Sequence, residues 1–344
     1  MLLKNFLMKN KYNKPYIIAE TACAHDGSLM KLIKMIDFVG NSNAQSIQFR
    51  VFSHKNTITK NHPDFKKIKK LVLTKDEWIK CFNYTKKKYP NLEIISSIPS
   101  SDELIFSDKL GADAFKLHSA DLDNYELLEA TSKIGKRIDL SVGASTLAEI
   151  KNAVNFIKNK NKNCKIWLLY GYQLFPTKPE KLNLKRILKL KKLFNLNVGY
   201  QDHSVNDHSG YAMPTLAIGL GINIIEKHIT DNAIRQGTDS ISAIDGKDFK
   251  QFVQICNNSF NSIGNGKFGN FSKDEQRYRI YCKKNLFVSK NLKKGSILNK
   301  EDIILRRSHK IGINAGDLKK IIGKKLTVNL KIQDQLYYKH LEKN

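Results

Sequence analysis

The strongest constraint on the fold is a repeated alternation of short apolar runs with longer amphipathic segments. The apolar runs predict strands over residues 16–20, 46–52, 93–98, 114–119, 138–142, 165–171, 197–203 and 222–228. Apolar residues at helical spacing predict helices over residues 32–39, 75–88, 124–134, 146–158, 179–194, 211–220 and 248–263. Strands that alternate with helices are typical of a parallel sheet, and eight such strands close a barrel. The sequence therefore predicts an α/β fold, a TIM (β/α)8 barrel.

A change in composition divides the chain. Its 344 residues exceed the size at which one hydrophobic core usually stops growing. Residues 264–269 form a Gly-rich polar stretch that is typical of a linker. After about Tyr278 the pattern changes to short β runs, such as Leu286 to Ser289 and Ile303 to Arg307. We therefore expect a barrel domain over residues 1–264, a linker over 265–277 and a small β-rich domain over 278–344.

The formal net charge of +27 favours an anionic partner, which could be a nucleic acid, a membrane surface or an acidic small substrate. The lysines are spread through the predicted helices together with many Asn and Ile residues. This distribution favours a bias in composition over a dedicated polyanion-binding face. The sequence has no aromatic RNA-binding signature and no zinc-finger spacing, so we expect no nucleic-acid partner.

Cysteine spacing and hydropathy indicate the compartment. The five cysteines lie far apart without a CxxC pair, which argues against a disulfide framework and favours a reducing cytoplasm. Residues 1–14 mix apolar residues with lysines and lack the continuous apolar core of a secretory signal. No segment of the sequence has the length and apolarity of a bilayer span. We expect a cytoplasmic protein with no membrane partner.

The predicted strands end almost entirely in polar residues. These residues are Glu20, Gln48, Arg50, Ser96, Ser97, Lys116, His118, Ser119, Ser141, Gln173, Asp202, His203, Glu226, Lys227 and His228. Each buried polar group without a partner would cost about 1 to 3 kcal/mol. Chemistry in such barrels takes place at the carboxyl ends of the strands. A ligand-binding floor at this end therefore explains the polar residues.

Two kinds of ligand are predicted at this floor. Arg50 and Lys116, with the hydroxyls of Ser119 and Ser141, suit an anion with phosphate and carboxylate oxygens. The alternative is that Lys116 pairs with a neighbouring carboxylate such as Glu20.

His203 and His228 end adjacent predicted strands, which would bring both imidazoles to one side of the barrel mouth. Two neutral imidazoles could hold a divalent metal and leave coordination positions open for a substrate. The alternative is two hydrogen-bonded core histidines, and His25, His118 and His208 are further candidates for ligands. Spacing alone leaves these alternatives open.

Several stretches together resemble the sialic acid synthase family over nearly the whole chain. They are IIAETACAHDG from Ile17, FKLHSAD from Phe115, LSVGAST from Leu140, VGYQDHS from Val198 and IIEKHITDNAIRQGTD from Ile224. The stretches NLKKGSILNKEDIILRR from Asn291 and IIGKKL from Ile321 resemble the C-terminal antifreeze-like (SAF) domain of that family. The EKH, GTD and DH elements in this order carry most of the specificity.

The resemblance implies a phosphoenolpyruvate-dependent transferase that forms a carbon–carbon bond. Its donor would be phosphoenolpyruvate, and its acceptor an N-acetylated amino-sugar aldehyde such as N-acetylmannosamine. The products would be a sialic, or more generally nonulosonic, acid and phosphate. The resemblance also implies a divalent metal, usually Mn2+ with Mg2+ or Co2+ as alternatives, and a domain-swapped homodimer.

The resemblance also implies roles for the residues of this chain that match the family's site positions. The resemblance implies His203 and His228 as metal ligands, and catalytic roles for Glu20, Lys116 and Asp239. We expect phosphoenolpyruvate to bind at Gln48, Arg50, Lys116, Ser119, Ser141 and Gln173. We expect the sugar to bind at Glu20, Phe175, Asp239 and Arg307, with Arg307 reaching across the dimer.

The chain departs from the family pattern where phosphate and sugar would bind. Gln48 and Arg50 stand where many relatives have Lys and Gln, so the positive charge has moved two residues along one strand face. Ile98, Gln201 and Phe175 are further departures, and Phe175 lacks a hydroxyl that a sugar site could use. Residues 205–210 are expected to lengthen the seventh loop.

These departures leave the acceptor open. It could be a legionaminic, a pseudaminic or another surface-polysaccharide precursor. A non-catalytic sugar-binding protein of polysaccharide biosynthesis is the alternative from another class.

Overall fold

A computed structural model describes residues 14–233 and 237–342 of the chain. The chain divides into two compact units, residues 1–264 and residues 265–344.

The first unit is a closed barrel of eight parallel strands, as the sequence predicts. The strands are β1 (Tyr16–Glu20), β2 (Ser46–Arg50), β3 (Glu93–Ser97), β4 (Ala114–Leu117), β5 (Arg137–Ser141), β6 (Ile166–Tyr170), β7 (Asn197–Asp202) and β8 (Ile224–Thr230). Each strand pairs with the next, and β8 pairs with β1 to close the barrel. A short strand, β9 (Ile244–Asp245), adds to the end of β8.

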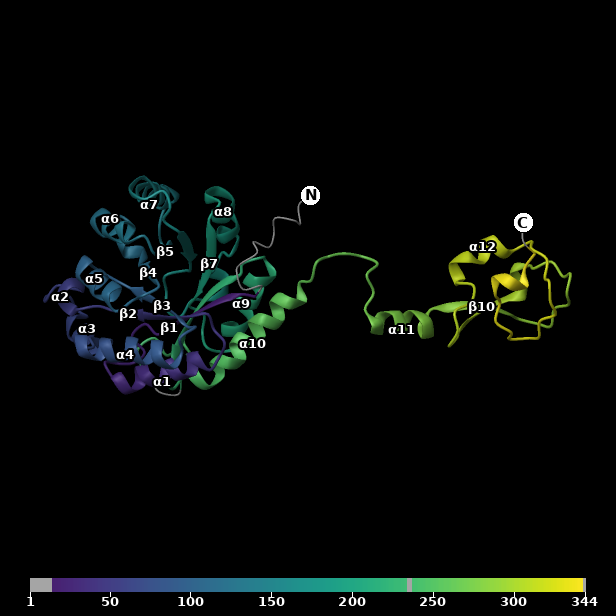
Figure 1. The fold of residues 1–344 in the computed structure, drawn as a ribbon, viewed down its shortest axis with the longest axis horizontal. Coiled ribbons are helices and arrows are strands. Elements are labelled where there is room, and N and C mark those ends of the chain that lie inside the picture. Colours follow the sequence, from purple (N-terminus) through teal and green to yellow (C-terminus); the bar gives the residue numbers. More distant parts are fainter. Residues whose placement is uncertain (1–13, 234–236, 343–344) are drawn as a thin grey trace. The chain divides into compact units, whose positions relative to one another are not determined.

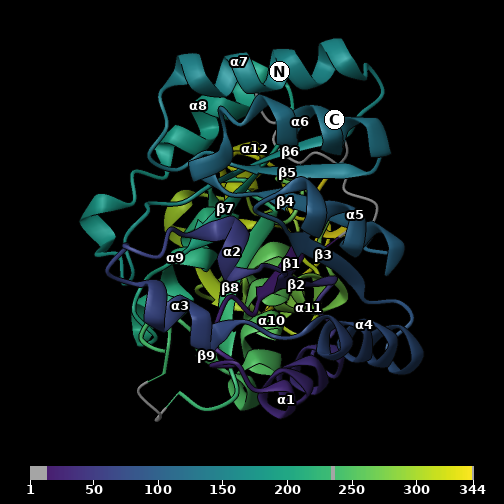
Figure 2. The ribbon, with the colours of Figure 1, turned by 90° about the vertical axis from the view of Figure 1, so that its left-hand side faces the viewer.

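Helices surround the strands on the outside (Figure 1, Figure 2). They are α1 (Leu29–Gly40), α2 (His54–Thr57), α3 (Phe65–Leu71), α4 (Lys75–Lys88), α5 (Ser101–Lys109), α6 (Tyr125–Ile134), α7 (Leu147–Lys160), α8 (Lys185–Phe194), α9 (His208–Gly219) and α10 (Gly246–Ser262). Capping boxes begin α4 at Thr74 and α7 at Thr146, where a hydroxyl and a glutamate satisfy the first backbone N–H groups. None of the helices in residues 14–233 and 237–342 has the length and apolarity needed to cross a membrane.

The helix predictions need correction in several places. Helix α5 was not predicted because only Leu104 among its three buried residues is apolar, which leaves little periodicity to detect. The expected helix over 179–194 is broken into a 3-10 turn, η2 (Pro179–Lys181), and α8. Asn183 between them has a φ of 46°, in the left-handed region that a right-handed helix excludes.

The expected loop over residues 205–210 is partly the first turn of α9. Asp207 accepts a hydrogen bond from the backbone N–H of Ser209 and caps this helix, so the helix begins earlier than its apolar spacing indicates. The seventh loop is correspondingly shorter than expected.

Two apolar clusters contain residues of the barrel strands. The larger cluster lies between the strands and the helices. A smaller cluster contains residues from β1, β3, β4, β6 and β8, namely Tyr16, Ile18, Ile95, Ala114, Leu169 and Ile224. Tyr16 and Ile18 alternate with Ile17 and Ala19 of the larger cluster, so the smaller cluster fills the inside of the barrel below Glu20.

The second unit has a hydrophobic core of its own. Its elements are α11 (Lys273–Cys282), β10 (Lys284–Val288), η3 (Lys300–Asp302), β11 (Ile303–Arg307), η4 (Ala315–Asp317), α12 (Leu318–Ile321) and η5 (Tyr338–His340). Strands β10 and β11 are antiparallel, with Lys284 opposite Arg307. Residues 273–277 of the expected linker belong to α11, which a capping box at Ser272 begins.

Candidate active site

A cavity of about 410 Å3 opens at the carboxyl ends of the barrel strands. Eight of the predicted site residues line it: Glu20, Arg50, Lys116, Gln173, Phe175, His203, His228 and Asp239. They come from β1, β2 and β4 and from the segments at the ends of β6, β7 and β8. The barrel therefore brings together most of the residues that the sequence assigned to one site.

Strand alternation selects which side chains of β7 and β8 reach this cavity. Gln201, His203, Glu226 and His228 line it, whereas Lys227 lies between two lining residues and is fully buried away from it. Side chains two residues apart on a strand lie on one face. The pairing of β7 with β8 then places the two histidines side by side.

Backbone space near His203 is also restricted. A Cβ atom at Gly171 would lie 2.5 Å from the carbonyl oxygen of Gln201 and 3.2 Å from Cε1 of His203. Only glycine therefore allows the end of β6 to approach the end of β7 this closely.

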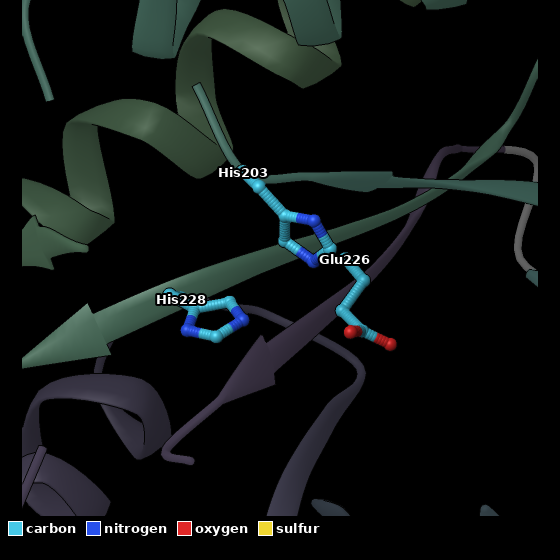
Figure 3. A group of neighbouring side chains, drawn as sticks. All are labelled: His203, Glu226 and His228. Atoms are coloured by element: carbon cyan, nitrogen blue, oxygen red, sulfur yellow. The ribbon is translucent and has the colours of Figure 1, made fainter. Parts of the chain in front are cut away.

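Three side chains at the cavity form a candidate metal centre. Each of His203, Glu226 and His228 offers one ligand atom, and these atoms lie within 4.8 Å of one another. The two imidazole rings are 5.4 Å apart between centroids and nearly perpendicular. Figure 3 shows the three side chains extending toward a common space.

The hydrogen bonds of these residues fit a divalent metal. Nδ1 of His203 lies 2.8 Å from the carbonyl oxygen of Tyr172, which can only accept, so Nδ1 donates and Nε2 keeps its lone pair. Within the described residues, Nδ1 of His228 and Oε2 of Glu226 are buried without a hydrogen-bond partner. Burial lowers the pKa of both histidines, which favours the neutral, metal-binding imidazole.

Glu226 was noted as a polar strand end but not predicted as a ligand. The signal was present, since Glu226 stands two residues before His228 in a strand and therefore shares its face.

Lys116 lies between two carboxylates. Its Nζ donates to Oε1 of Glu226 at 2.5 Å and lies 3.6 Å from Oε2 of Glu20, and all three side chains are buried. The alternative that Lys116 pairs with Glu20 is therefore realised, although the contact with Glu226 is closer. The ammonium group of Lys116 is thus already engaged by Glu226.

Glu20 is held in a tight turn at the end of β1. Its Oε1 accepts a hydrogen bond of 2.6 Å from the backbone N–H of Ala22, whose φ is 42°. Burial raises the pKa of Glu20 to about 7, against the opposing effect of Lys116. Glu20 can therefore exchange a proton near neutral pH.

Arg50 is the cation that remains available to an anion. Among the ion pairs of the described residues none involves Arg50, and its Nη1 has only a weak contact of 3.9 Å to Sγ of Cys23. Its guanidinium lies 5.4 Å from the ring of Phe52, which orients it at the cavity wall.

Three of the residues predicted to bind phosphoenolpyruvate do not line the cavity. Gln48 is fully buried, and neither atom of its amide group has a hydrogen-bond partner in the described part of the chain. Ser141 donates to Oε1 of Gln201 at 2.8 Å. Ser119 begins the 3-10 turn η1 (Ser119–Asp121). Their role in donor binding stays a prediction.

The residues predicted to bind the sugar belong to both units. The Phe175 ring packs against His203 at 4.1 Å and His228 at 5.5 Å between centroids, and 43% of its surface is exposed. Asp239 lines the cavity, and burial raises its pKa while Arg50 opposes this. Arg307 is exposed on β11 of the second unit.

Comparisons with known proteins agree with this geometry. The model of the NeuB family matches residues 31–268. An N,N'-diacetyllegionaminic acid synthase of Campylobacter jejuni is 29% identical, over 94% of this chain and 98% of that relative. A pseudaminic acid synthase of the same species is 26% identical, over 98% of both chains. The solved sialic acid synthetase of Leptospira borgpetersenii is 28% identical with a TM-score of 0.69, over 77% of this chain and 91% of that one.

Proposed function

Because this chain belongs to the NeuB family, we propose that it condenses phosphoenolpyruvate with the open-chain aldehyde of an N-acetylated amino sugar. The products are a nonulosonic acid and phosphate. The observation that carries the proposal is one cavity in which a His–Glu–His group adjoins Lys116 and Arg50. The enzyme is thus a phosphoenolpyruvate-dependent transferase that forms a carbon–carbon bond.

His203, Glu226 and His228 would hold the divalent metal of this reaction. When bound, this metal would supply Lewis-acid polarisation of the aldehyde oxygen. Two imidazoles and one carboxylate suit several divalent first-row ions. We propose Mn2+, with Mg2+ and Co2+ as the ions to compare.

The chain's own residues account for proton movement in the first step. The methylene carbon of phosphoenolpyruvate forms a bond to the aldehyde carbon, and the aldehyde oxygen takes up a proton. Glu20 supplies this proton, because its raised pKa leaves it partly protonated near neutral pH. Lys116, 3.6 Å away, stabilises the carboxylate that remains.

The second step releases phosphate. Water adds to the former enol carbon, and its surplus proton returns to Glu20. The bond between this carbon and the phosphate oxygen then breaks, and both electrons leave with phosphate. The hydroxyl oxygen forms the carbonyl double bond, and its proton passes to the departing phosphate. Arg50, which has no carboxylate partner among the described residues, stabilises the charge on the phosphate oxygens.

The acceptor is proposed as an amino sugar with at least one acetamido group. The relatives named above make different products, so similarity alone supports the class and leaves the individual sugar open. Phe175 gives the cavity an apolar face beside His203 and His228. This face favours an acceptor with a methyl or acetamido group over one with a further hydroxyl there.

The second unit is proposed as an SAF domain that serves a partner barrel. The sequence motifs over Asn291 to Leu326 and the exposed position of Arg307 support this assignment. In the proposed domain-swapped homodimer, the guanidinium of Arg307 contacts the N-acyl group of the sugar bound to the other chain.

Phosphate release is the direct test of the function. The full-length protein would be mixed with phosphoenolpyruvate, one metal and one acceptor from a panel that includes N-acetylmannosamine and diacetamido sugars. We expect release that depends on both metal and acceptor. Absence of release with every acceptor and metal, from protein that binds phosphoenolpyruvate, would contradict the proposed reaction.

Substitution of Phe175 refines the acceptor. Phe175→Tyr adds one hydroxyl and should shift the ratio of kcat/KM toward acceptors with a further hydroxyl by up to about tenfold, the value of one hydrogen bond. An unchanged ratio would remove Phe175 from the sugar site.

A further inference from the structure

His118 lies at the cavity without a role in the reaction described above. It directly follows β4, two residues after Lys116, and precedes the 3-10 turn η1. Its side chain is exposed and lines the same cavity as Arg50 and Lys116. Within the described residues it is not a member of the His–Glu–His group.

A backbone contact determines which ring nitrogen of His118 carries the proton. The N–H of Ala120 donates to Nδ1 of His118 at 3.3 Å. A backbone N–H group can only donate, so Nδ1 must present its lone pair. In the neutral ring the proton is therefore on Nε2, which becomes a hydrogen-bond donor.

His203 has the opposite arrangement. Its Nδ1 faces the carbonyl oxygen of Tyr172, so the proton is on Nδ1 and the lone pair on Nε2. Two histidines that line one cavity thus have opposite tautomers. His203 suits a metal, whereas His118 suits an oxygen that accepts a hydrogen bond.

The cavity has fewer available cations than the donor substrate has anionic groups. Phosphoenolpyruvate has two anionic groups, a phosphate and a carboxylate. Lys116 already donates to Glu226, which leaves Arg50 as the lining cation without a carboxylate partner among the described residues. A neutral N–H donor can serve the other anionic group without adding a further charge to the cavity.

We propose that Nε2–H of His118 donates a hydrogen bond to an anionic oxygen of the donor substrate, and so acts as a specificity residue for phosphoenolpyruvate. The inference rests on the proposed function. It assigns to His118 a contact with the substrate in addition to its contact with Ala120, which caps the turn.

Two conservative substitutions separate substrate binding from capping. The amide of Gln reaches the position of Nε2 and can donate, but it leaves Ala120 N–H uncapped. The amide oxygen of Asn reaches the position of Nδ1 and can cap Ala120, but it provides no donor at the position of Nε2. His118→Leu removes both contacts at similar size.

Binding of phosphoenolpyruvate to the full-length protein, measured by calorimetry without acceptor, is the test. We expect His118→Asn and His118→Leu to raise the Kd about tenfold or more, and His118→Gln to stay within about threefold of wild type. The KM of the acceptor should be unchanged in all three. Thermal unfolding of each variant shows whether it has folded.

The other outcomes are distinct. If Asn preserves the Kd and Gln does not, His118 only caps the turn and the inference is wrong. If all three variants bind like wild type while wild type releases phosphate, the inference fails and the proposed function stands. If wild type does not bind phosphoenolpyruvate at all, both fail together.

Discussion

Nζ of Lys227 donates to Oδ2 of Asp202 at 2.6 Å, and both side chains are fully buried behind the two candidate metal-binding histidines. Asp202 also accepts hydrogen bonds from the hydroxyls of Tyr200 and Ser204. Because Asp202 precedes His203 and Lys227 precedes His228, this ion pair joins the two strand ends that carry the histidines. It connects the stability of the barrel with the geometry of its site.

Removal of one partner should therefore be costly. Asp202→Asn leaves the ammonium group of Lys227 buried without a counter-charge, which should lower the free energy of unfolding by about 3 to 5 kcal/mol. Both tryptophans, Trp78 and Trp167, lie in the barrel, so denaturant unfolding followed by tryptophan fluorescence reports on this unit. The control is Glu129→Gln, which removes a partly exposed partner of Lys133 and Lys160 and should lower the free energy of unfolding much less. If both substitutions lower the free energy of unfolding equally, the buried ion pair stabilises the barrel no more than a surface pair does.

Loss of a ligand should remove metal binding and activity together. Glu226→Gln keeps the size of the side chain and removes its charge. We expect Mn2+ affinity, measured by calorimetry, to fall by more than about 100-fold, the upper figure for residues that only orient a ligand. Glu103→Gln changes a buried carboxyl group outside the metal group and serves as control. Normal Mn2+ affinity in Glu226→Gln would leave only the histidines as ligands.

Arg50 should govern the affinity for the donor. Arg50→Gln should raise the KM of phosphoenolpyruvate about 10- to 100-fold, because charge-assisted hydrogen bonds contribute about 1.5 to 3 kcal/mol. Arg50→Lys keeps the charge without the forked geometry and should give an intermediate value. The exposed Arg186, which lies outside the cavity, provides the control Arg186→Gln. An unchanged KM in Arg50→Gln would exclude a contact between Arg50 and the phosphate.

Acid should destabilise the barrel through His25. Burial lowers the pKa of this fully buried imidazole from 6.5 to about 4, and its Nδ1 accepts from Gly27 N–H at 3.1 Å. Between these pKa values the unfolded chain binds a proton that the folded chain does not. The contribution of neutral His25 to the free energy of unfolding is therefore complete above pH 6.5. It is lost as the pH falls toward 4, and the total loss is about 3 kcal/mol.

His25→Asn, whose amide oxygen can accept from Gly27, should flatten this dependence in denaturant titrations at several pH values. His62 makes the same kind of contact to Asp64 N–H at an exposed position, so His62→Asn is the matched control. If the free energy of unfolding depends on pH equally in both variants and in wild type, groups other than His25 cause the acid sensitivity.

Mixed dimers test whether Arg307 acts on the partner's site. Arg307→Ala should be inactive at the sugar concentrations that saturate wild type, and His228→Ala should be inactive in its own barrel. If Arg307 serves the other chain, dimers formed from the two variants contain one intact site and one that lacks both residues. Unfolding and refolding the mixture should then restore up to about a quarter of wild-type activity by random pairing. No recovery, despite hybrid dimers detected by mass, would place Arg307 outside a shared site.

Much of the barrel could be predicted from local patterns. Alternation of apolar runs with amphipathic segments fixed the number and order of the strands, because each strand must bury one face inside the barrel and the other against helices. The helices that escaped prediction, such as α5, have few apolar contacts. Asn183 interrupts the helix expected over 179–194 because its backbone is left-handed. Asn tolerates this conformation but does not require it, so the break had no clear signal in the sequence.

The sequence by itself determined which residues stand at the carboxyl ends of the strands, and hence the chemical character of the site. Only the tertiary structure decided how these residues are arranged. It groups Glu226 with the two histidines and places Lys116 between two carboxylates. It also leaves Gln48 and Ser141 outside the cavity lining. The reason is physical. Alternation along one strand is local, whereas contacts across the barrel depend on register and on the backbone groups, such as Tyr172 C=O and Ala120 N–H, that orient each ring.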